Sequence, residues 1–275
     1  MARGRDGMNA LGTTAPATDA FSRQSGVFDA IDAANPLIGR MRALVRAEAL
    51  KHMKPRDALL ELNAGTGIDS FYFAEQGLRV LATDGAEGMV AELQAKQRTH
   101  PQLHVDVMAC SFLELERLGD RRFDHVFSNF GGLNCTPHLD QALHGIDRVL
   151  RPGGTCALVI MPRFSPWELL AVLKGRVGLA LRRWRRGGTV AHLEGLTFLC
   201  HYFSPRYVRK HLGQGYEVIT QRALSLVVPP PHMERFPSRW PRLLRALDRI
   251  EEGIAHRWPF RNWGDHYLII LRKAA

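Results

Sequence analysis

The chain has 275 residues and 45% hydrophobic content, which suits one α/β domain with an insertion rather than two full domains. Its net charge of +10 is uneven: residues 1–150 hold 16 basic and 19 acidic side chains, whereas residues 151–275 hold 21 and 8. Four widely spaced cysteines and the lack of an apolar run of ~20 residues argue against a zinc site, a disulfide framework and a membrane span, so we expect a cytoplasmic protein without a bound metal.

The N-terminal segment is predicted to form a leader and a lid. Residues 1–20 lack the apolar core of a signal peptide and are expected to be disordered. Apolar residues with a period near 3.6 predict a helix over Pro36–His52, ended by Pro55. We expect residues 21–57 to form a helical lid, in which Phe28 either lines a pocket or only packs.

Residues 58–161 alternate regularly between apolar strands and helices. This rhythm predicts a doubly wound, mostly parallel sheet of seven strands with helices on both faces. The predicted strands are Ala58–Leu62, Arg79–Ala82, Leu103–Met108, Phe123–Ser128 and Thr155–Met161. The predicted helices are Ile68–Gln76, Glu87–Gln97, Phe112–Arg117 and Leu139–Leu150.

The rhythm breaks after Met161. Residues 162–203 are predicted to be a helical cap insertion, with one long helix over Pro166–Arg186 and a strand over Leu196–Phe203. Residues 204–275 are expected to complete the core sheet and to carry an inserted helix. Their predicted elements are helix Ser204–Leu212, strand Tyr216–Val227, helix Met233–His256 and strand His266–Leu271.

Two candidate ligand-binding features lie in residues 1–150: a glycine loop and an acidic residue at the end of a strand. The stretch Leu59–Gly67 reads Leu-Leu-Glu-Leu-Asn-Ala-Gly-Thr-Gly, which is a strand running into a glycine turn and a helix. The next strand ends in Asp84, 17 residues beyond Gly67, where nucleoside-binding folds place a carboxylate that accepts hydrogen bonds from ribose hydroxyls. Asp84 could instead only cap the following helix.

Four such elements together resemble class I S-adenosylmethionine-dependent methyltransferases. They are the glycine loop, Asp84, the fourth-strand stretch Phe123–Phe130 and the turn Arg148–Gly154. Asn63 stands where the family commonly has its first glycine, a mild departure because Asn tolerates a left-handed backbone. The resemblance covers Leu59–Met161 and implies S-adenosylmethionine as the cofactor.

The resemblance also implies which residues meet the cofactor. Glu61 would hold its ammonium group, and the loop glycines would allow close backbone approach. Where the family commonly has an acid for the adenine amino group, this chain has Ser111 and Phe112. The implied cofactor residues are Glu61, Asn63, Ala64, Gly65, Thr66, Gly67, Asp84, Gly85, Met89, Ser111, Phe112, Asn129 and Phe130.

Candidates for a catalytic base follow from the rule that ligands bind at the carboxyl edge of such a sheet. His201 is the first choice, beside His138 and Tyr202, although a packing or solvent-facing role for these side chains stays open. Many methyl transfers need no base, because in-line displacement depends chiefly on holding the acceptor in position.

We expect a small-molecule acceptor, methylated on the oxygen of a hydroxyl or carboxyl group, with a lipid-like acceptor as one option. The helix predicted over Pro166–Arg186 either packs as a cap or makes peripheral contact with an anionic membrane. The alternatives are an RNA methyltransferase using the basic half and a non-catalytic binding protein. Nucleic acid is disfavoured, since no RNA-binding module is recognisable. The sequence carries no signal for an oligomeric state.

Overall fold

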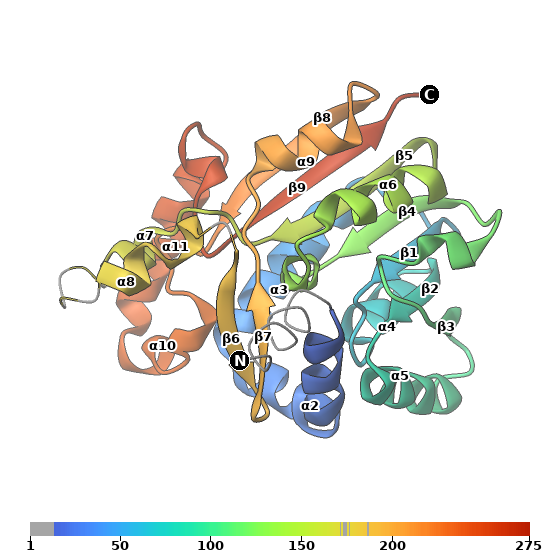
Figure 1. The fold of residues 1–275 in the computed structure, drawn as a ribbon, viewed down its shortest axis with the longest axis horizontal. Coiled ribbons are helices and arrows are strands. Elements are labelled where there is room, and N and C mark those ends of the chain that lie inside the picture. Colours follow the sequence, from blue (N-terminus) through green and yellow to red (C-terminus); the bar gives the residue numbers. More distant parts are fainter. Residues whose placement is uncertain (1–13, 171, 173–174, 176, 186) are drawn as a thin grey trace, which may run out of the picture.

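A seven-stranded sheet forms the centre of the fold in our computed structural model, which describes residues 14–170, 172, 175, 177–185 and 187–275 (Figure 1). The strand order is β3-β2-β1-β4-β5-β9-β8. β9 runs antiparallel to both of its neighbours, and the other paired strands are parallel. The strands are β1 Ala58–Leu62, β2 Arg79–Asp84, β3 Val105–Ala109, β4 Phe123–Ser128, β5 Leu150–Ile160, β8 Tyr216–Leu224 and β9 His266–Lys273. The predicted doubly wound, mostly parallel sheet of seven strands is confirmed.

The strand order reverses direction between β1 and β4, which lie side by side at the centre of the sheet. In their register Leu62 lies opposite Ser128, so the two strands end together at the carboxyl edge. The loops that leave them turn to opposite sides, because one chain path continues toward β3 and the other toward β8. A crevice opens at such a switch point, and ligands of open α/β sheets bind there.

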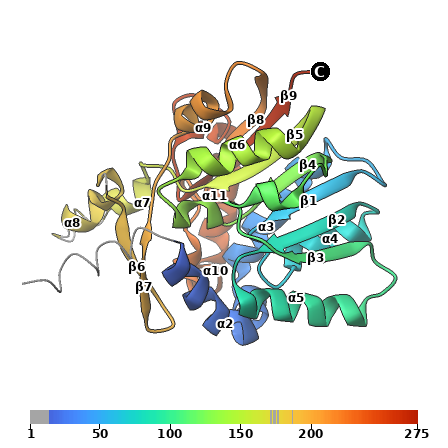
Figure 2. The ribbon, with the colours of Figure 1, turned by 45° about the vertical axis from the view of Figure 1, so that its right-hand side comes forward.

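Helices cover both faces of the sheet (Figure 2). Leu59 and Leu60 point to opposite faces, as successive residues of a strand must, and belong to different apolar clusters. One face packs against α3 Pro36–Leu50, α4 Ile68–Glu75 and α5 Glu87–Thr99. The other packs against α6 Leu139–Val149 and α9 Pro205–Leu212, together with the short turns η1 Leu115–Leu118 and η2 Gly132–Cys135.

The predicted disordered leader is too long. Helix α2 spans Ala15–Ala34, so the end of residues 1–20 is helical, while residues 1–13 lie outside the described residues. Ala17 and Ala20 are buried against Phe198. Their small side chains, which look featureless in sequence, are what allow α2 to pack closely on the rest of the chain.

The predicted long helix over Pro166–Arg186 is wrong. The described part of this segment forms the short pieces α7 Pro166–Leu169, α8 Val177–Ala180 and η4 Arg182–Trp184. Gly175 has a φ of +70°, which no continuous α-helix contains. Glu168 also bonds Arg182 and Arg183, although residues 14 or 15 apart in a helix would be about 21 Å apart. The chain therefore folds back on itself.

A hairpin follows instead of a single strand. β6 Thr189–Leu193, which the sequence did not predict, pairs with β7 Leu196–Cys200. Glu194 and Gly195 have φ values of +49° and +75°, as a tight two-residue hairpin turn requires. The hairpin stands apart from the central sheet and packs against α2 (Figure 1).

The helix predicted over Met233–His256 is also divided. The segment holds η5 Pro231–Met233, α10 Phe236–Arg239 and α11 Pro241–Ile254, and η6 Phe260–Asn262 follows. Pro241 forces Trp240 out of helical geometry and so separates α10 from α11. Among the helices of the described residues, none is long and apolar enough to cross a bilayer.

Candidate functional site

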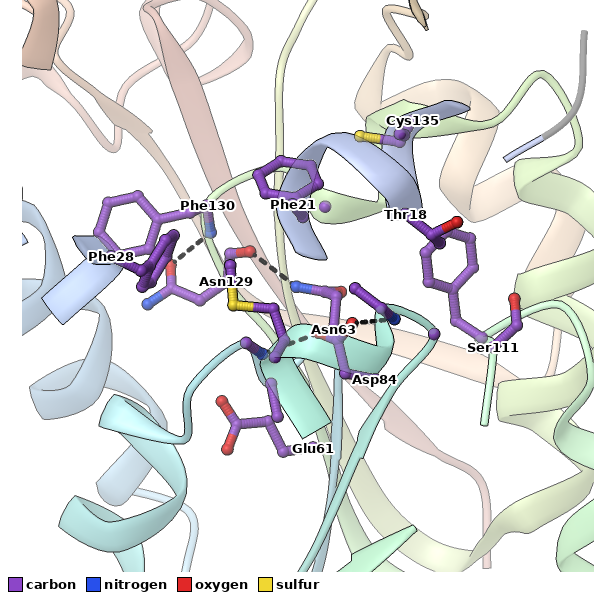
Figure 3. Close-up of a pocket in the computed structure, with 18 of the residues that line it drawn as sticks. Thr18, Phe21, Phe28, Glu61, Asn63, Asp84, Ser111, Asn129, Phe130 and Cys135 are labelled. Carbon is purple, nitrogen blue, oxygen red and sulfur yellow. Dashed lines mark hydrogen bonds between the residues drawn. The ribbon is translucent and has the colours of Figure 1, made fainter. Parts of the chain in front are cut away.

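A pocket of about 960 Å³, including its open mouth, lies at the carboxyl ends of β1, β2 and β4 (Figure 3). Thr66 and Gly67 do not line it. The other residues that the sequence predicted at a cofactor do: Glu61, Asn63, Ala64, Gly65, Asp84, Gly85, Met89, Ser111, Phe112, Asn129 and Phe130.

The loop after β1 has left-handed backbone at Asn63, Gly65 and Gly67, with φ values of +45°, +58° and +85°. A β-carbon at Gly65 would lie 3.7 Å from the ring of Phe28 and would project into the pocket. At Gly67 it would crowd Leu93 at 3.1 Å. Gly65 thus keeps the pocket open, whereas Gly67 lets α4 pack against α5.

Asp84 braces this loop from the tip of β2. Its Oδ2 accepts a hydrogen bond of 2.8 Å from the Gly65 N–H, and its Oδ1 accepts one of 2.8 Å from Ala86. A carboxylate has about four acceptor sites, so capacity remains on the pocket side. Burial raises the pKa of Asp84, and the backbone N–H groups partly offset that rise. Asp84 does not cap α5, because the N-cap of that helix is Ala86 and no side chain caps it.

Glu61 is a buried acid at the end of β1. The Ser70 hydroxyl donates a hydrogen bond to it. Burial and, to a lesser degree, the nearby Asp69 carboxylate raise its pKa well above its ordinary value. An uncompensated buried carboxylate is costly, and a bound cation would remove that cost. Glu61 therefore suits the ammonium group of a ligand.

A polar network that sequence reasoning missed surrounds Glu61. Asp69 pairs with Arg42 and Arg46 and accepts a 3.0 Å hydrogen bond from the Asn129 side chain. Arg42 also stacks over the ring of Phe130, 4.5 Å from its centroid. The sequence does show an acid, Asp69, two residues after the glycine turn. Nothing in the sequence indicated that Arg42 and Arg46 of α3 pair with it.

Comparison with known proteins points to methyltransferases. A family model described as a methyltransferase domain matches residues 59–154. A malonyl-[acyl-carrier protein] O-methyltransferase of Serratia marcescens is 34% identical over 150 residues, 54% of either chain. A demethylmenaquinone methyltransferase of Beutenbergia cavernae is 34% identical over 124 residues, 44% of this chain and 48% of that protein. Residues 59–154 therefore form a methyltransferase domain, which supports the resemblance to class I S-adenosylmethionine-dependent methyltransferases.

Solved methyltransferase structures share this fold. The CcbJ methyltransferase from Streptomyces caelestis has a TM-score of 0.59 at 20% identity, covering 94% of this chain and 99% of that one. The 1,6-didemethyltoxoflavin-N1-methyltransferase of Burkholderia thailandensis, solved with S-adenosylhomocysteine, has a TM-score of 0.58 at 18% identity, covering 95% and 88%. The match to the two curated relatives above spans only about half of their length.

The pocket residues fit the cofactor of this family, S-adenosylmethionine. Glu61 offers a buried carboxyl group to its ammonium, and Asp84 offers free acceptor sites to its ribose hydroxyls. Met89 and Phe112 supply apolar surface for a ring beside Asp84. The chemistry of each of these groups matches one part of the cofactor.

Helix α2 lies over the pocket. Thr18, Phe21 and Phe28 point from it into the pocket (Figure 3). α2 also lies tight against α5, because a β-carbon at Gly88 would overlap the backbone of Ser22. The sequence indicated a lid with Phe28, but it missed Thr14, Ala17 and Thr18, since these fall in the predicted leader.

The end of the pocket away from Glu61 is largely apolar. Phe21, Phe112 and Cys135 line it together with Ser111. Burial raises the pKa of the Cys135 thiol far above neutral pH, so this sulfur is not a base. Every lining residue comes from residues 14–135, so the described residues of the basic half and of the predicted cap contribute none. The segment predicted as a cap meets the pocket wall only indirectly, because its Phe198 packs on α2.

None of the three predicted catalytic residues lines the pocket. The His201 ring lies against Gly188, where a β-carbon would be 2.9 Å from its Cε1, and burial lowers its pKa. His138 is exposed at the start of α6. Tyr202 is buried under the Arg183 guanidinium, 4.9 Å from the ring centroid, and burial raises its pKa to about 12.

Proposed function

We propose that this methyltransferase methylates an oxygen atom of a small, largely apolar molecule, and that the acceptor oxygen belongs to a carboxylate. When bound, S-adenosylmethionine would supply an electrophilic methyl group. The chain would hold the two reactants in line and keep water away from them, which is the main contribution such a reaction needs.

One observation carries the choice of a carboxylate. The apolar end of the pocket is lined by Phe21, Phe112, Ser111 and Cys135, and among the described residues no histidine, lysine or tyrosine lines it. A hydroxyl acceptor must lose its proton during transfer, whereas a carboxyl group is already ionised at neutral pH. The site therefore suits an acceptor that brings its own negative charge. One relative is by its name an O-methyltransferase.

A second candidate is an aromatic, quinol-like acceptor. The rings of Phe21, Phe28 and Phe112 suit a flat partner, because aromatic pairs gain energy beyond their buried area. Several relatives are named demethylmenaquinone methyltransferases. RNA as the acceptor has less support, since none of the described basic side chains of residues 151–275 reaches the pocket.

The experiment is a product analysis with the purified full chain and S-adenosylmethionine. One panel holds aliphatic and aryl carboxylic acids, and the other holds matched phenols and reduced quinones. Mass spectrometry detects the added methyl group, and mild alkali then cleaves methyl esters but leaves methyl ethers and ring methyl groups intact. Ester products support the proposal. Products formed only from phenols or quinols overturn it and favour the second candidate.

The matched control is the variant Asp84→Ala, which should lose turnover with every acceptor. A product that forms equally well with this variant does not come from the proposed site.

A further inference from the structure

The acidic side chains of helix α11 are neutralised by the domain itself. Glu251 is fully buried and accepts hydrogen bonds from the backbone N–H groups of residues 225–228. Asp248 and Glu252 form ion pairs with arginines of α3 and β8. The negative charge of the helix is therefore balanced on its inner side and edge.

The opposite face of α11 is basic. Arg242, Arg245 and Arg249 are exposed, and their spacing of three and four residues places them on one side of the helix. Three more exposed arginines flank the helix in sequence, namely Arg235, Arg239 and Arg257. Among the residues that the structure describes, none of the six has an acidic partner within 4.0 Å. Six unbalanced cations thus lie within 23 residues.

Apolar side chains accompany these arginines. Leu243 and Ile250, two turns apart on one line of α11, are 47% and 51% exposed. Trp240 and Trp258, which precede and follow the helix, are 53% and 76% exposed. The Arg239 guanidinium lies over the Trp240 ring at 5.4 Å from its centroid. We call these four apolar residues and Arg242, Arg245 and Arg249 the α11 face.

We propose that the α11 face docks on an anionic lipid membrane. The arginines would pair with the phosphate and carboxylate groups of the lipid heads, and the tryptophans, Leu243 and Ile250 would enter the headgroup boundary. Tryptophan favours that boundary because its ring is apolar and its N–H is polar. Nucleic acid or an acidic protein would satisfy the charge, but the interleaved leucine, isoleucine and tryptophans match a surface that is both anionic and partly apolar.

This assignment differs from the sequence-based one. Peripheral membrane contact was one of two alternatives for the helix predicted over Pro166–Arg186, and the structure contains no such continuous helix. The chain that leads into α10 and α11 contacts the junction of α2 and α3. The Asn35 side chain, at the junction of α2 and α3, donates a 2.8 Å hydrogen bond to the carbonyl of Pro231, shortly before α10. In Figure 1, α10 and α11 lie together at one end of the molecule, away from β3.

The test is cosedimentation of the full chain with phosphatidylcholine vesicles that either contain or lack phosphatidylserine, over a salt series. Binding should require phosphatidylserine and weaken with salt. The triple variant Arg242→Ser/Arg245→Ser/Arg249→Ser should lower the partition coefficient by roughly 100-fold. The matched control is Arg206→Ser/Arg209→Ser/Lys210→Ser, which removes the same charge from the exposed side of α9 and should bind nearly as the parent.

Two further measurements locate the contact. Lipids with brominated chains should quench the fluorescence of the parent, and Trp240→Phe/Trp258→Phe should lose more of that quenching than Trp184→Phe, a change at an exposed tryptophan of the cap. The proposal is overturned if the α9 and α11 triple variants lose vesicle binding equally. It is also overturned if the parent does not bind phosphatidylserine vesicles. Tighter binding to RNA or to polyglutamate than to vesicles overturns it as well, and assigns the face to that partner. Unchanged S-adenosylmethionine affinity shows that the variants are folded.

Discussion

Asn63 fits so closely against Gly132 that a β-carbon at residue 132 would lie 2.5 Å from the Asn63 Cγ. The Asn63 side chain accepts a 2.6 Å hydrogen bond from Ser128 and donates one of 3.1 Å to the carbonyl of Asn129. It thereby joins the ends of β1 and β4 across the switch point of the sheet. Asn63 stands where the family commonly has a glycine. Its side chain fits there because Gly132 in the facing loop has no side chain.

The fit between Asn63 and Gly132 predicts that Gly132→Ala is disruptive. The added methyl group must displace the Asn63 amide, at a cost of about 1–3 kcal/mol, and should weaken S-adenosylmethionine binding through the distorted loop. Thermal unfolding and calorimetric titration measure the two effects. The double variant Asn63→Gly/Gly132→Ala should recover part of the stability, because the clash is removed. A double variant as unstable as Gly132→Ala would contradict this explanation.

Asp84 is predicted to be the main anchor for the ribose. Asp84→Ala should reduce S-adenosylhomocysteine affinity at least tenfold, since a hydrogen bond to a charged group contributes about 1.5–3 kcal/mol. Asp84→Asn should lose less, because one amide oxygen can still accept from Gly65 or Ala86. Titration calorimetry gives both affinities, and circular dichroism shows whether the fold is intact. Unchanged affinity in a folded Asp84→Ala protein would place the cofactor elsewhere.

Glu61 is predicted to destabilise the free protein at neutral pH. Because its pKa in the folded state lies above the ordinary 4.5, the folded state binds its proton more tightly than the unfolded state. Stability is therefore lost as pH rises from the ordinary value through the raised one. Glu61→Gln, which can still accept from Ser70, should be stabilised at pH 7 by on the order of 1 kcal/mol, with a smaller gain near pH 4.5.

The same substitution should weaken the binding of S-adenosylmethionine, because the ammonium group loses its anionic partner. Melting curves from pH 4.5 to 8 and titrations at pH 7 measure the two trends. Loss of stability together with unchanged affinity would rule out a ligand-binding role for Glu61.

His201 is predicted to be dispensable for the chemical step. His201→Ala should lower stability by about 1–3 kcal/mol, because a buried ring is lost, while turnover at saturating acceptor stays within about twofold. A general base normally contributes 10²–10⁴-fold. The pH dependence of kcat gives a second readout and should be flat between about pH 6.5 and 8.5 for a carboxylate acceptor. A folded variant that loses 100-fold in kcat would restore His201 as the base.

The local sequence determined the cofactor half of the site. Each group there lies at a strand end, and the parallel sheet brings the ends of β1, β2 and β4 together whatever the side chains beyond them do. Strand periodicity and turn residues placed Glu61 and Asp84 at strand ends, and the family resemblance then assigned them, with Asn129, to the cofactor. The departure at Asn63 was expected to be mild because Asn tolerates a left-handed backbone, and Asn63 has one.

Only the tertiary structure decided the covering elements. The short pieces around Gly175 follow from the Glu168 pairs with Arg182 and Arg183, which no periodicity reveals. Helix α2 begins within the segment that the sequence predicts to be disordered. Packing of its Ala17 and Ala20 against Phe198 stabilises the helix there. Long-range contacts of this kind also kept His201 out of the pocket and brought Arg42 into it. The physical reason is that local pattern fixes backbone direction and strand ends, whereas lids, caps and the choice of acceptor depend on which distant surfaces pack together.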